Sequence, residues 1–248
     1  LRFAPFAGDG AFWYSCLHEP TMHPRFTEYL LQMPRAERQK VFFTTNLTRR
    51  MPADYYAMLA DSGIHNINIS IESLDPAIYE RMRKGARHRI FAENWDMLLD
   101  AFSHGEAPPK LRYIMMAYKS NLREIPSLVE HLLTERRGSE VEVRYTFDMS
   151  HIGADFKQAE YLDESEWLWL RDSLAHRLGK DVILSMPPGV GEPKQPASEP
   201  AATEPAAAPP LAADAPPPGY MHGRYGVRLL WDGTLEVRRV WGAAGQPG

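Results

Sequence analysis

The regular alternation of short apolar runs with amphipathic stretches constrains this chain more than any other feature. Strand-like runs at residues 12–17, 41–45, 66–71, 111–118 and 141–147 alternate with stretches of helical periodicity. The helical stretches follow Pro24 and Pro52, span 75–84, 90–104 and 123–134, and resume after Asp163. This order predicts parallel strands joined by helical crossovers, which is an α/β fold.

Side-chain periodicity and residues suited to helix ends support these helices. Apolar residues recur at helical spacing in two stripes, one made by Phe91, Trp95, Leu98 and Phe102, the other by Ile125, Leu128, Val129, Leu132 and Leu133. Asp75 before Pro76 is typical of a helix start, and Asp163 with Glu166 has the spacing of a capping box. We therefore expect each stripe to bury one helix face on a sheet.

Two of the strand-like runs carry a polar face. In residues 66–72, Ile67, Ile69 and Ile71 share one face, and Asn66, Asn68, Ser70 and Glu72 share the other. In residues 141–148, the polar face holds Glu142, Arg144, Thr146 and Asp148. A parallel sheet covered by helices on both sides would be apolar on both faces. The alternation favours a barrel or open barrel whose inner face lines a wet cavity, and a sheet with one face in solvent is the alternative.

Charge and cysteine content exclude several classes of protein. The 248 residues include 28 Lys+Arg and 32 Asp+Glu, which gives a formal net charge of −4. This balance disfavours a protein that coats nucleic acid or binds an anionic membrane, and no apolar run is long enough to span a bilayer. The single cysteine, Cys16, excludes an intrachain disulfide framework. A lone thiol fits a reducing compartment, so we expect a cytoplasmic protein.

The composition changes abruptly from residue 187 to 218, where 11 of 32 residues are proline and nine are alanine. Without apolar periodicity, this segment is expected to be an extended, disordered linker. Beyond it, 225–231 and 234–240 have the pattern of two strands around an Asp-Gly turn. We therefore expect a barrel-like domain over 1–186, the linker over 187–218, and a C-terminal β-hairpin extension over 219–248.

Three groups of residues occur in chain order at strand ends. They are the run from Leu17 to Pro24, the run Phe43-Thr44-Thr45-Asn46, and the run from Ile69 to Pro76 followed by Tyr79, Arg83 and Gly85-Ala86. Together they resemble the radical S-adenosylmethionine (radical SAM) superfamily. The resemblance implies a partial (β/α)6 TIM-like barrel that here lacks its first strand. It also implies an enzyme that reductively cleaves S-adenosylmethionine to a 5′-deoxyadenosyl radical for hydrogen abstraction from an unknown substrate.

The resemblance further implies a set of cofactor-binding residues. Leu17, His18, Glu19 and Pro20 match the Gly-Gly-Glu-Pro motif, whose backbone and Glu help to hold the amino group of the methionine moiety. In this chain Leu17 and His18 replace both glycines.

Further positions match along the later strands. Thr45 and Asn46 match the end of the family's third strand. Ser70 and Glu72 match positions that meet the ribose hydroxyls or the methionine end, and Arg83 matches a basic residue that pairs with the cofactor carboxylate. The substrate is expected deeper in the cavity, in a set made by Arg144, Thr146 and Asp148.

The family's chemistry also needs a [4Fe–4S] cluster held by three cysteines spaced Cys-x3-Cys-x2-Cys. Cys16 cannot replace them, so no metal ligand is assigned within this chain and the cluster ligands are expected upstream of residue 1. The start at Leu1 favours truncation over loss of the cluster, and such a fragment is expected to be inactive alone. Two alternatives stay open: a degenerate relative that binds SAM or another ligand, and a scaffold or interaction protein. The expected partners are the substrate and an electron donor such as a flavodoxin or a ferredoxin.

Overall fold

The computed structural model describes residues 11–13, 19–146, 152–191, 224–229 and 235–240. The chain divides into two compact units, Leu1–Lys194 and Gln195–Gly248.

A six-stranded parallel sheet forms the centre of the first unit. Its strands are β1 Phe12–Trp13, β2 Val41–Thr45, β3 Asn66–Ser70, β4 Lys110–Met116, β5 Gly138–Arg144 and β6 Val182–Ser185. They lie in chain order across the sheet, and each pairs in parallel with the next. In the described part of the chain β6 does not pair with β1, so the sheet stays open. The prediction of a partial, unclosed α/β barrel is confirmed.

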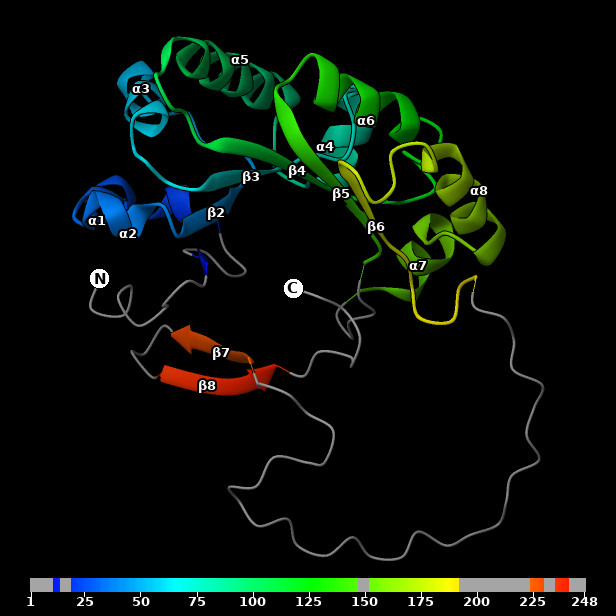
Figure 1. Cartoon of the computed structure of the whole chain (residues 1–248). Coiled ribbons are helices and arrows are strands. Elements are labelled where there is room, and N and C mark those ends of the chain that lie inside the picture. The colour runs from blue at the N-terminus through cyan, green and yellow to red at the C-terminus, as the bar shows by residue number, and fades with distance from the viewer. Residues whose placement is uncertain (1–10, 14–18, 147–151, 192–223, 230–234, 241–248) are drawn as a thin grey trace, which may run out of the picture. The chain divides into compact units, whose positions relative to one another are not determined.

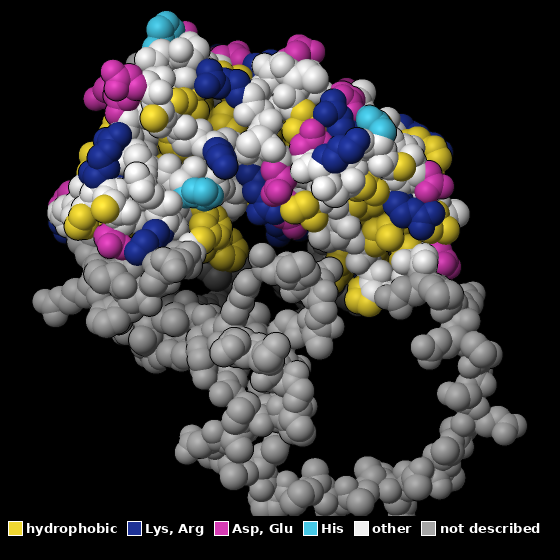
Figure 2. Space-filling model, viewed as in Figure 1, with side chains coloured by type: hydrophobic (Ala, Val, Ile, Leu, Met, Phe, Trp, Pro, Cys, Tyr) yellow, Lys and Arg dark blue, Asp and Glu magenta, His cyan; other side chains and the backbone are white. Residues whose placement is uncertain are grey.

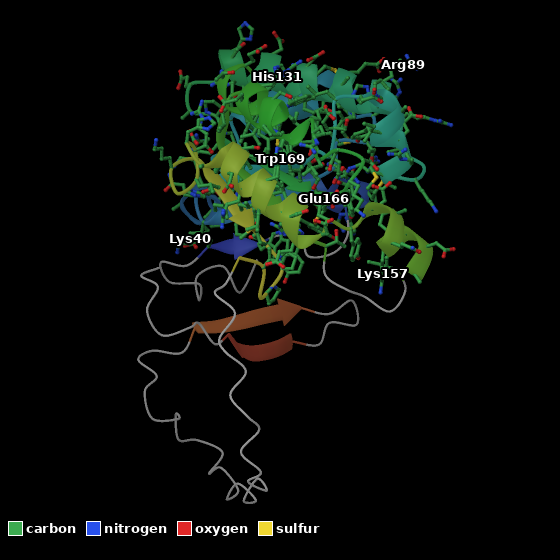
Figure 3. The ribbon with its side chains drawn as sticks, turned by 90° about the vertical axis from the view of Figure 1, so that its right-hand side faces the viewer. Lys40, Arg89, His131, Lys157, Glu166 and Trp169 are labelled. Atoms are coloured by element: carbon green, nitrogen blue, oxygen red, sulfur yellow. The ribbon has the colours of Figure 1, made fainter. Side chains whose placement is uncertain are left out.

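Helices connect these strands, and Figure 1 shows α3, α5 and α6 along the convex side of the curved sheet. The helical elements are η2 Pro20–Met22, α1 Phe26–Leu31, α2 Arg35–Arg38, α3 Ala53–Ala60, α4 Pro76–Met82, α5 His88–His104, α6 Ile125–Thr134, α7 Ala154–Glu160 and α8 Glu164–Leu174. Trp169 of α8 is labelled on the side of the molecule that faces the viewer in Figure 3. Arg123 stacks on its indole ring in a cation–π contact, with the guanidinium carbon 4.2 Å from the ring centroid. That contact fixes α8 beside the start of α6.

The predicted helix starts are confirmed in atomic detail. The Asp75 side chain accepts hydrogen bonds from the amides of Ala77 at 2.8 Å and Ile78 at 3.0 Å, at the first turn of α4. Asp163 and Glu166 form the reciprocal capping box at the start of α8. These bonds satisfy amide groups that an isolated helix end would leave to water.

The two faces of the sheet differ as the alternation predicts. Ile67, Ile69 and Ile71 are fully buried on the helix-covered face, together with the stripes of α5 and α6 except for the partly buried Leu133. Each such side chain stabilises the fold by about 1.5–3 kcal/mol relative to exposure. The opposite face is polar and only partly shielded from solvent: Asn68 is 2% exposed and its amide donates to Thr44 Oγ1 at 3.2 Å, whereas Asn66 and Ser70 are half-buried. The polar residues therefore line the concave side of an open barrel.

Helix α7 and strand β6 lack a sequence signal, and several predicted strands have different bounds, β5 most of all. Helix α7 has no buried residue, so it has no apolar stripe to detect, and β6 is only four residues long. Strand β5 begins at Gly138 and ends at Arg144, whereas the sequence predicts 141–147. A Cβ at Gly138 would lie 2.7 Å from the carbonyl oxygen of Leu132. Close packing on α6 thus places a residue of poor strand propensity at the start of β5.

The second unit contains an antiparallel pair of strands, β7 Arg224–Leu229 and β8 Leu235–Val240. Leu229 pairs with Leu235, so the predicted hairpin strands are present with slightly different bounds. The Asp-Gly turn between them lies outside the described residues. In the predicted linker, residues 188–191 form turns and Val190 packs against the core of the first unit, while 192–218 lie outside the described residues.

The described surface mixes charges of both signs. Figure 2 shows basic and acidic side chains interspersed over the visible face, with no large area of a single sign. Within the described ranges, no helix combines the length and apolar character needed to cross a bilayer.

Candidate functional site

Five of the predicted site residues gather at the carboxyl ends of the strands. Glu19 precedes η2, Thr45 and Asn46 end β2, Glu72 follows β3, and Arg83 follows α4. Ligands of α/β folds bind at this end of the sheet because the strand-to-helix loops converge there. Four separate segments thus contribute polar groups to one region.

Glu19 ties the segment after β1 to the end of β2. Its Oε1 accepts hydrogen bonds from the Thr21 hydroxyl at 2.6 Å, the Thr21 amide at 3.2 Å and the Thr45 hydroxyl at 2.9 Å. Its Oε2 accepts one bond, from the Asn46 amide at 2.7 Å. Because a carboxylate oxygen has two lone pairs, Oε2 keeps acceptor capacity for a further donor.

The turn after β2 is strained and is held by a residue that the sequence analysis missed. Leu47 has a positive φ of 53°, which is uncommon for a residue with a branched apolar side chain. The buried Asn94 of α5 donates through Nδ2 to the carbonyls of Leu47 at 2.6 Å and Arg49 at 2.8 Å. The only sequence signal for this role is an amide side chain within the apolar stripe of a helix. Asn94 thus positions the β2 turn that carries Asn46.

Replacing Asn94 with Ala is expected to lower the free energy of unfolding by about 1–3 kcal/mol, because two buried carbonyls lose their donor. Urea denaturation followed by circular dichroism measures the change. The neighbouring Glu93, whose ion pairs with Arg50 and Arg89 lie at the surface, provides the control. Glu93→Gln is expected to change stability by less than about 0.5 kcal/mol. Equal effects of the two substitutions would contradict the role of Asn94.

Glu72 and Arg83 form a two-pronged ion pair that is largely buried. The Arg83 Nη2 lies 2.8 Å from Glu72 Oε1, and Arg83 Nε donates to Glu72 Oε2. The Glu72 side chain is 9% exposed and the Arg83 side chain is 20% exposed. Burial by itself lowers the pKa of Arg83, but the charge and hydrogen bonds of Glu72 outweigh it, so the pKa of Arg83 is raised. The Arg83 guanidinium therefore stays charged.

The backbone around Glu72 is fixed by two polar residues from the turn after β4. Asn121 is buried, and its Nδ2 donates to the carbonyls of Glu72 at 2.7 Å and Met116 at 3.0 Å. Glu124 accepts from the Leu74 amide at 2.7 Å and from the Ser73 hydroxyl. The loop that carries Glu72 is therefore held in one conformation without any ligand.

Tyr79 places a buried hydroxyl beside these charges. Its side chain is fully buried, and its Oη has no hydrogen-bond partner among the described residues. Burial raises the pKa of Tyr79; Arg83 counteracts this, while Glu72 and Glu19 add to it. The phenol stays protonated, and the guanidinium carbon of Arg83 lies 6.0 Å from the centroid of its ring.

The predicted substrate set is only partly described. Arg144 and Thr146 lie on the inner face at the end of β5, and Asp148 lies outside the described residues. The Thr146 hydroxyl donates to Tyr118 Oη at 2.8 Å. Arg144 joins an ion-pair network on the same face, in which its Nη2 lies 2.6 Å from Glu142. Sequence alternation identifies this face, but it does not identify which of its charges meet.

The remaining predicted residues have separate positions. Ser70 ends β3 on the inner face, and Pro20 begins η2. Leu17 and His18 lie outside the described residues, as does Cys16. Within the described ranges, no group of three His, Cys, Asp or Glu side chains is placed to hold a metal ion.

Comparisons with known proteins agree with this architecture. A family model described as the Radical SAM superfamily matches residues 7–152, which is more than half of the chain. No curated protein sequence matches the chain.

Two solved structures have a similar arrangement. The crystal structure of SuiB from Streptococcus suis superposes with a TM-score of 0.51 at 16% identity, over 68% of this chain and 37% of SuiB. A radical SAM methyltransferase from Sphaerobacter thermophilus gives a TM-score of 0.47 at 11% identity, over 76% of this chain and 55% of the enzyme. The chain thus spans less than two thirds of either protein. At such identity, the similarity to SuiB shows a common fold and nothing about substrate.

Proposed function

The chain belongs to the radical SAM superfamily, and on this basis we propose that it is the core of an enzyme acting on S-adenosylmethionine (SAM). When bound, SAM supplies the chemistry: its reductive cleavage gives a 5′-deoxyadenosyl radical that abstracts hydrogen from the substrate. The observation that carries the proposal is that Glu19, bonded to the Asn46 amide, and the largely buried pair of Glu72 and Arg83 both lie at the carboxyl ends of the strands, with Arg83 beside the Tyr79 ring.

The residues in this region fit the methionine end of SAM. Glu19 Oε2 can accept from an ammonium group in addition to the Asn46 amide. Arg83 uses two of its five N–H donors on Glu72 and can offer others to a carboxylate. The Tyr79 hydroxyl has no acceptor among the described residues, and leaving a buried donor unpaired costs about 1–3 kcal/mol. A ligand oxygen beside Arg83 would satisfy that donor.

We assign the roles as follows. Glu19 accepts from the amino group, Arg83 donates to the carboxylate, and Glu72 with Ser70 meets the ribose or the methionine end. Leu17, His18 and Pro20 approach the ligand through their backbone, and Thr45 with Asn46 holds Glu19 in place. The ordered hydrogen bonds of Glu19 and Glu72 are formed without a ligand, so the site is preorganised.

A [4Fe–4S] cluster is part of the family's chemistry, but cysteine ligands are absent from the described ranges. We therefore derive no step through a cluster. The cluster cysteines, an electron-donor protein such as a flavodoxin or a ferredoxin, and a cytoplasmic location remain proposals about the whole protein.

Isothermal titration of the chain with SAM tests the binding site directly. We expect saturable binding that is weakened at least tenfold by the Glu19→Gln substitution, because one carboxylate partner of the ammonium group is lost. S-adenosylhomocysteine serves as the comparison ligand, because it lacks the sulfonium charge of SAM but keeps the amino and carboxylate groups that the site is proposed to bind. Binding of neither compound would contradict the proposal.

Cleavage requires the natural full-length protein after anaerobic iron–sulfur reconstitution and reduction. Formation of 5′-deoxyadenosine is expected. Binding of SAM without cleavage would favour a degenerate ligand-binding relative, and absence of both would leave the scaffold alternative.

A further inference from the structure

Four charged side chains on the inner face of β4 and β5 form one network. Arg112 forms ion pairs with Glu140 and Glu142, the latter at 2.8 Å between Nη2 and Oε2. Arg144 Nη2 lies 2.6 Å from the same Oε2 of Glu142. Two guanidinium groups therefore share one carboxylate oxygen on the inner face of the sheet.

Arg144 is the member of this network at the carboxyl end of β5. Within the described ranges, Arg112 forms ion pairs with two carboxylates, and Arg144 forms one, with Glu142. The Nε atoms of both arginines are buried without a hydrogen-bond acceptor in the described ranges, although Arg112 Nε lies within ion-pair distance of Glu140. Nε and Nη2 form the edge of a guanidinium that binds a carboxylate through two parallel hydrogen bonds. Half of that edge is unused, and a buried donor without an acceptor is costly.

Arg144 lies at the same level of the barrel as Glu72, two strands away. Asn121 bridges the carbonyls of Glu72 and Met116, and Met116 is paired with Arg144 in the register of β4 and β5. Neighbouring strands are about 4.8 Å apart, which puts the two positions on the order of 10 Å from each other. A small organic molecule fits between a ligand at Glu72 and the guanidinium of Arg144.

We propose that Arg144 binds a carboxylate group of the substrate, and that Glu142 holds the guanidinium in place until the substrate arrives. The inference rests on the proposed function, because it names the substrate class of that site. Glu142 already shows that a carboxylate fits the Nη2 donor. A dianionic phosphate is disfavoured, because Glu140 and Glu142 would repel it more strongly than a monoanion. Tyr118 Oη accepts a hydrogen bond from the Thr146 hydroxyl, so its own O–H can still donate a hydrogen bond to the substrate carboxylate.

Nuclear magnetic resonance of the arginine Nε–H groups tests this without knowledge of the substrate. The whole chain is titrated with acetate at constant ionic strength, and the Arg144 signal is assigned by its loss in Arg144→Lys. We expect a saturable shift of the Arg144 signal. The Nε–H signal of Arg171, which pairs with Asp172 at the surface, is the internal control and should not saturate.

Two substitutions are expected to change the acetate affinity of Arg144 in opposite directions. Glu142→Gln removes the competing carboxylate, so the acetate concentration at half-saturation should fall about tenfold if the internal pair is closed about nine tenths of the time. Arg112→Gln removes the arginine that shares Glu142 with Arg144. Glu142 should then pair more strongly with Arg144, so the acetate concentration at half-saturation should rise. Unchanged affinity in Glu142→Gln, absence of saturation in the wild-type chain, or saturation with inorganic phosphate but not acetate would each overturn the proposal. The titration contains no SAM, so its result is independent of whether SAM binds.

Discussion

Replacing Arg83 with Gln is expected to lower the free energy of unfolding by about 3–5 kcal/mol, the largest effect of any single charge removal in this site. Glu72 is 9% exposed, and without Arg83 its carboxyl group would lose its basic partner in a site with little solvent. The cost arises from an uncompensated buried carboxylate, not from the loss of a surface ion pair. Urea denaturation, with the slope compared between variants, measures the change.

Two variants separate this explanation from a general sensitivity of the α4 region. The double substitution Glu72→Gln, Arg83→Gln removes both charges and is expected to recover at least half of the lost stability. Arg81→Gln, two residues earlier and within α4, removes a side chain that is 59% exposed and whose Nη2 lies 3.8 Å from Glu160 Oε1. It should cost less than about 0.5 kcal/mol. Equal losses in the double variant and in Arg83→Gln would refute the buried-charge explanation.

The same variants report on ligand binding. If Arg83 and Glu72 contact SAM, the double variant should regain stability but not SAM affinity. Recovery of both would assign the pair a purely structural role.

Replacing Glu19 with Ala is expected to destabilise the fold by about 2–3 kcal/mol and to abolish SAM binding. Four hydrogen bonds to the carboxylate are lost, and the amides of Thr21 and Asn46 lose their acceptor. The segment after β1 is then no longer tied to the end of β2. Calorimetric unfolding and SAM titration on the same sample measure both effects.

A graded series distinguishes the contributions. Thr45→Val keeps the shape of the side chain and removes one donor to Glu19, so it should cost about 1 kcal/mol and leave SAM binding measurable. An effect of Thr45→Val as large as that of Glu19→Ala would show that the β2 end, rather than the carboxylate, dominates. The Glu19 interpretation would then be wrong.

The strand faces could be predicted because they depend on local periodicity. Alternation along β3 and β5 placed Ile67 and Val141 under the helices and Glu72 and Arg144 on the inner face, and burial confirms this division. The helix starts at Asp75 and Asp163 were predictable for the same reason, since a cap and its amides are within a few residues of each other. Helix α7 and the early start of β5 had no such signal.

Sequence by itself determined which residues share a face and which loops lie at the carboxyl ends of the strands, because side-chain alternation and helix capping act over a few residues. Only the tertiary structure decided which groups meet. Arg83 pairs with Glu72 across 11 positions, Asn94 holds the β2 turn across 47, and Glu142 is shared by two arginines from neighbouring strands. Those pairings depend on strand register and on where each crossover helix returns the chain, which no local pattern encodes.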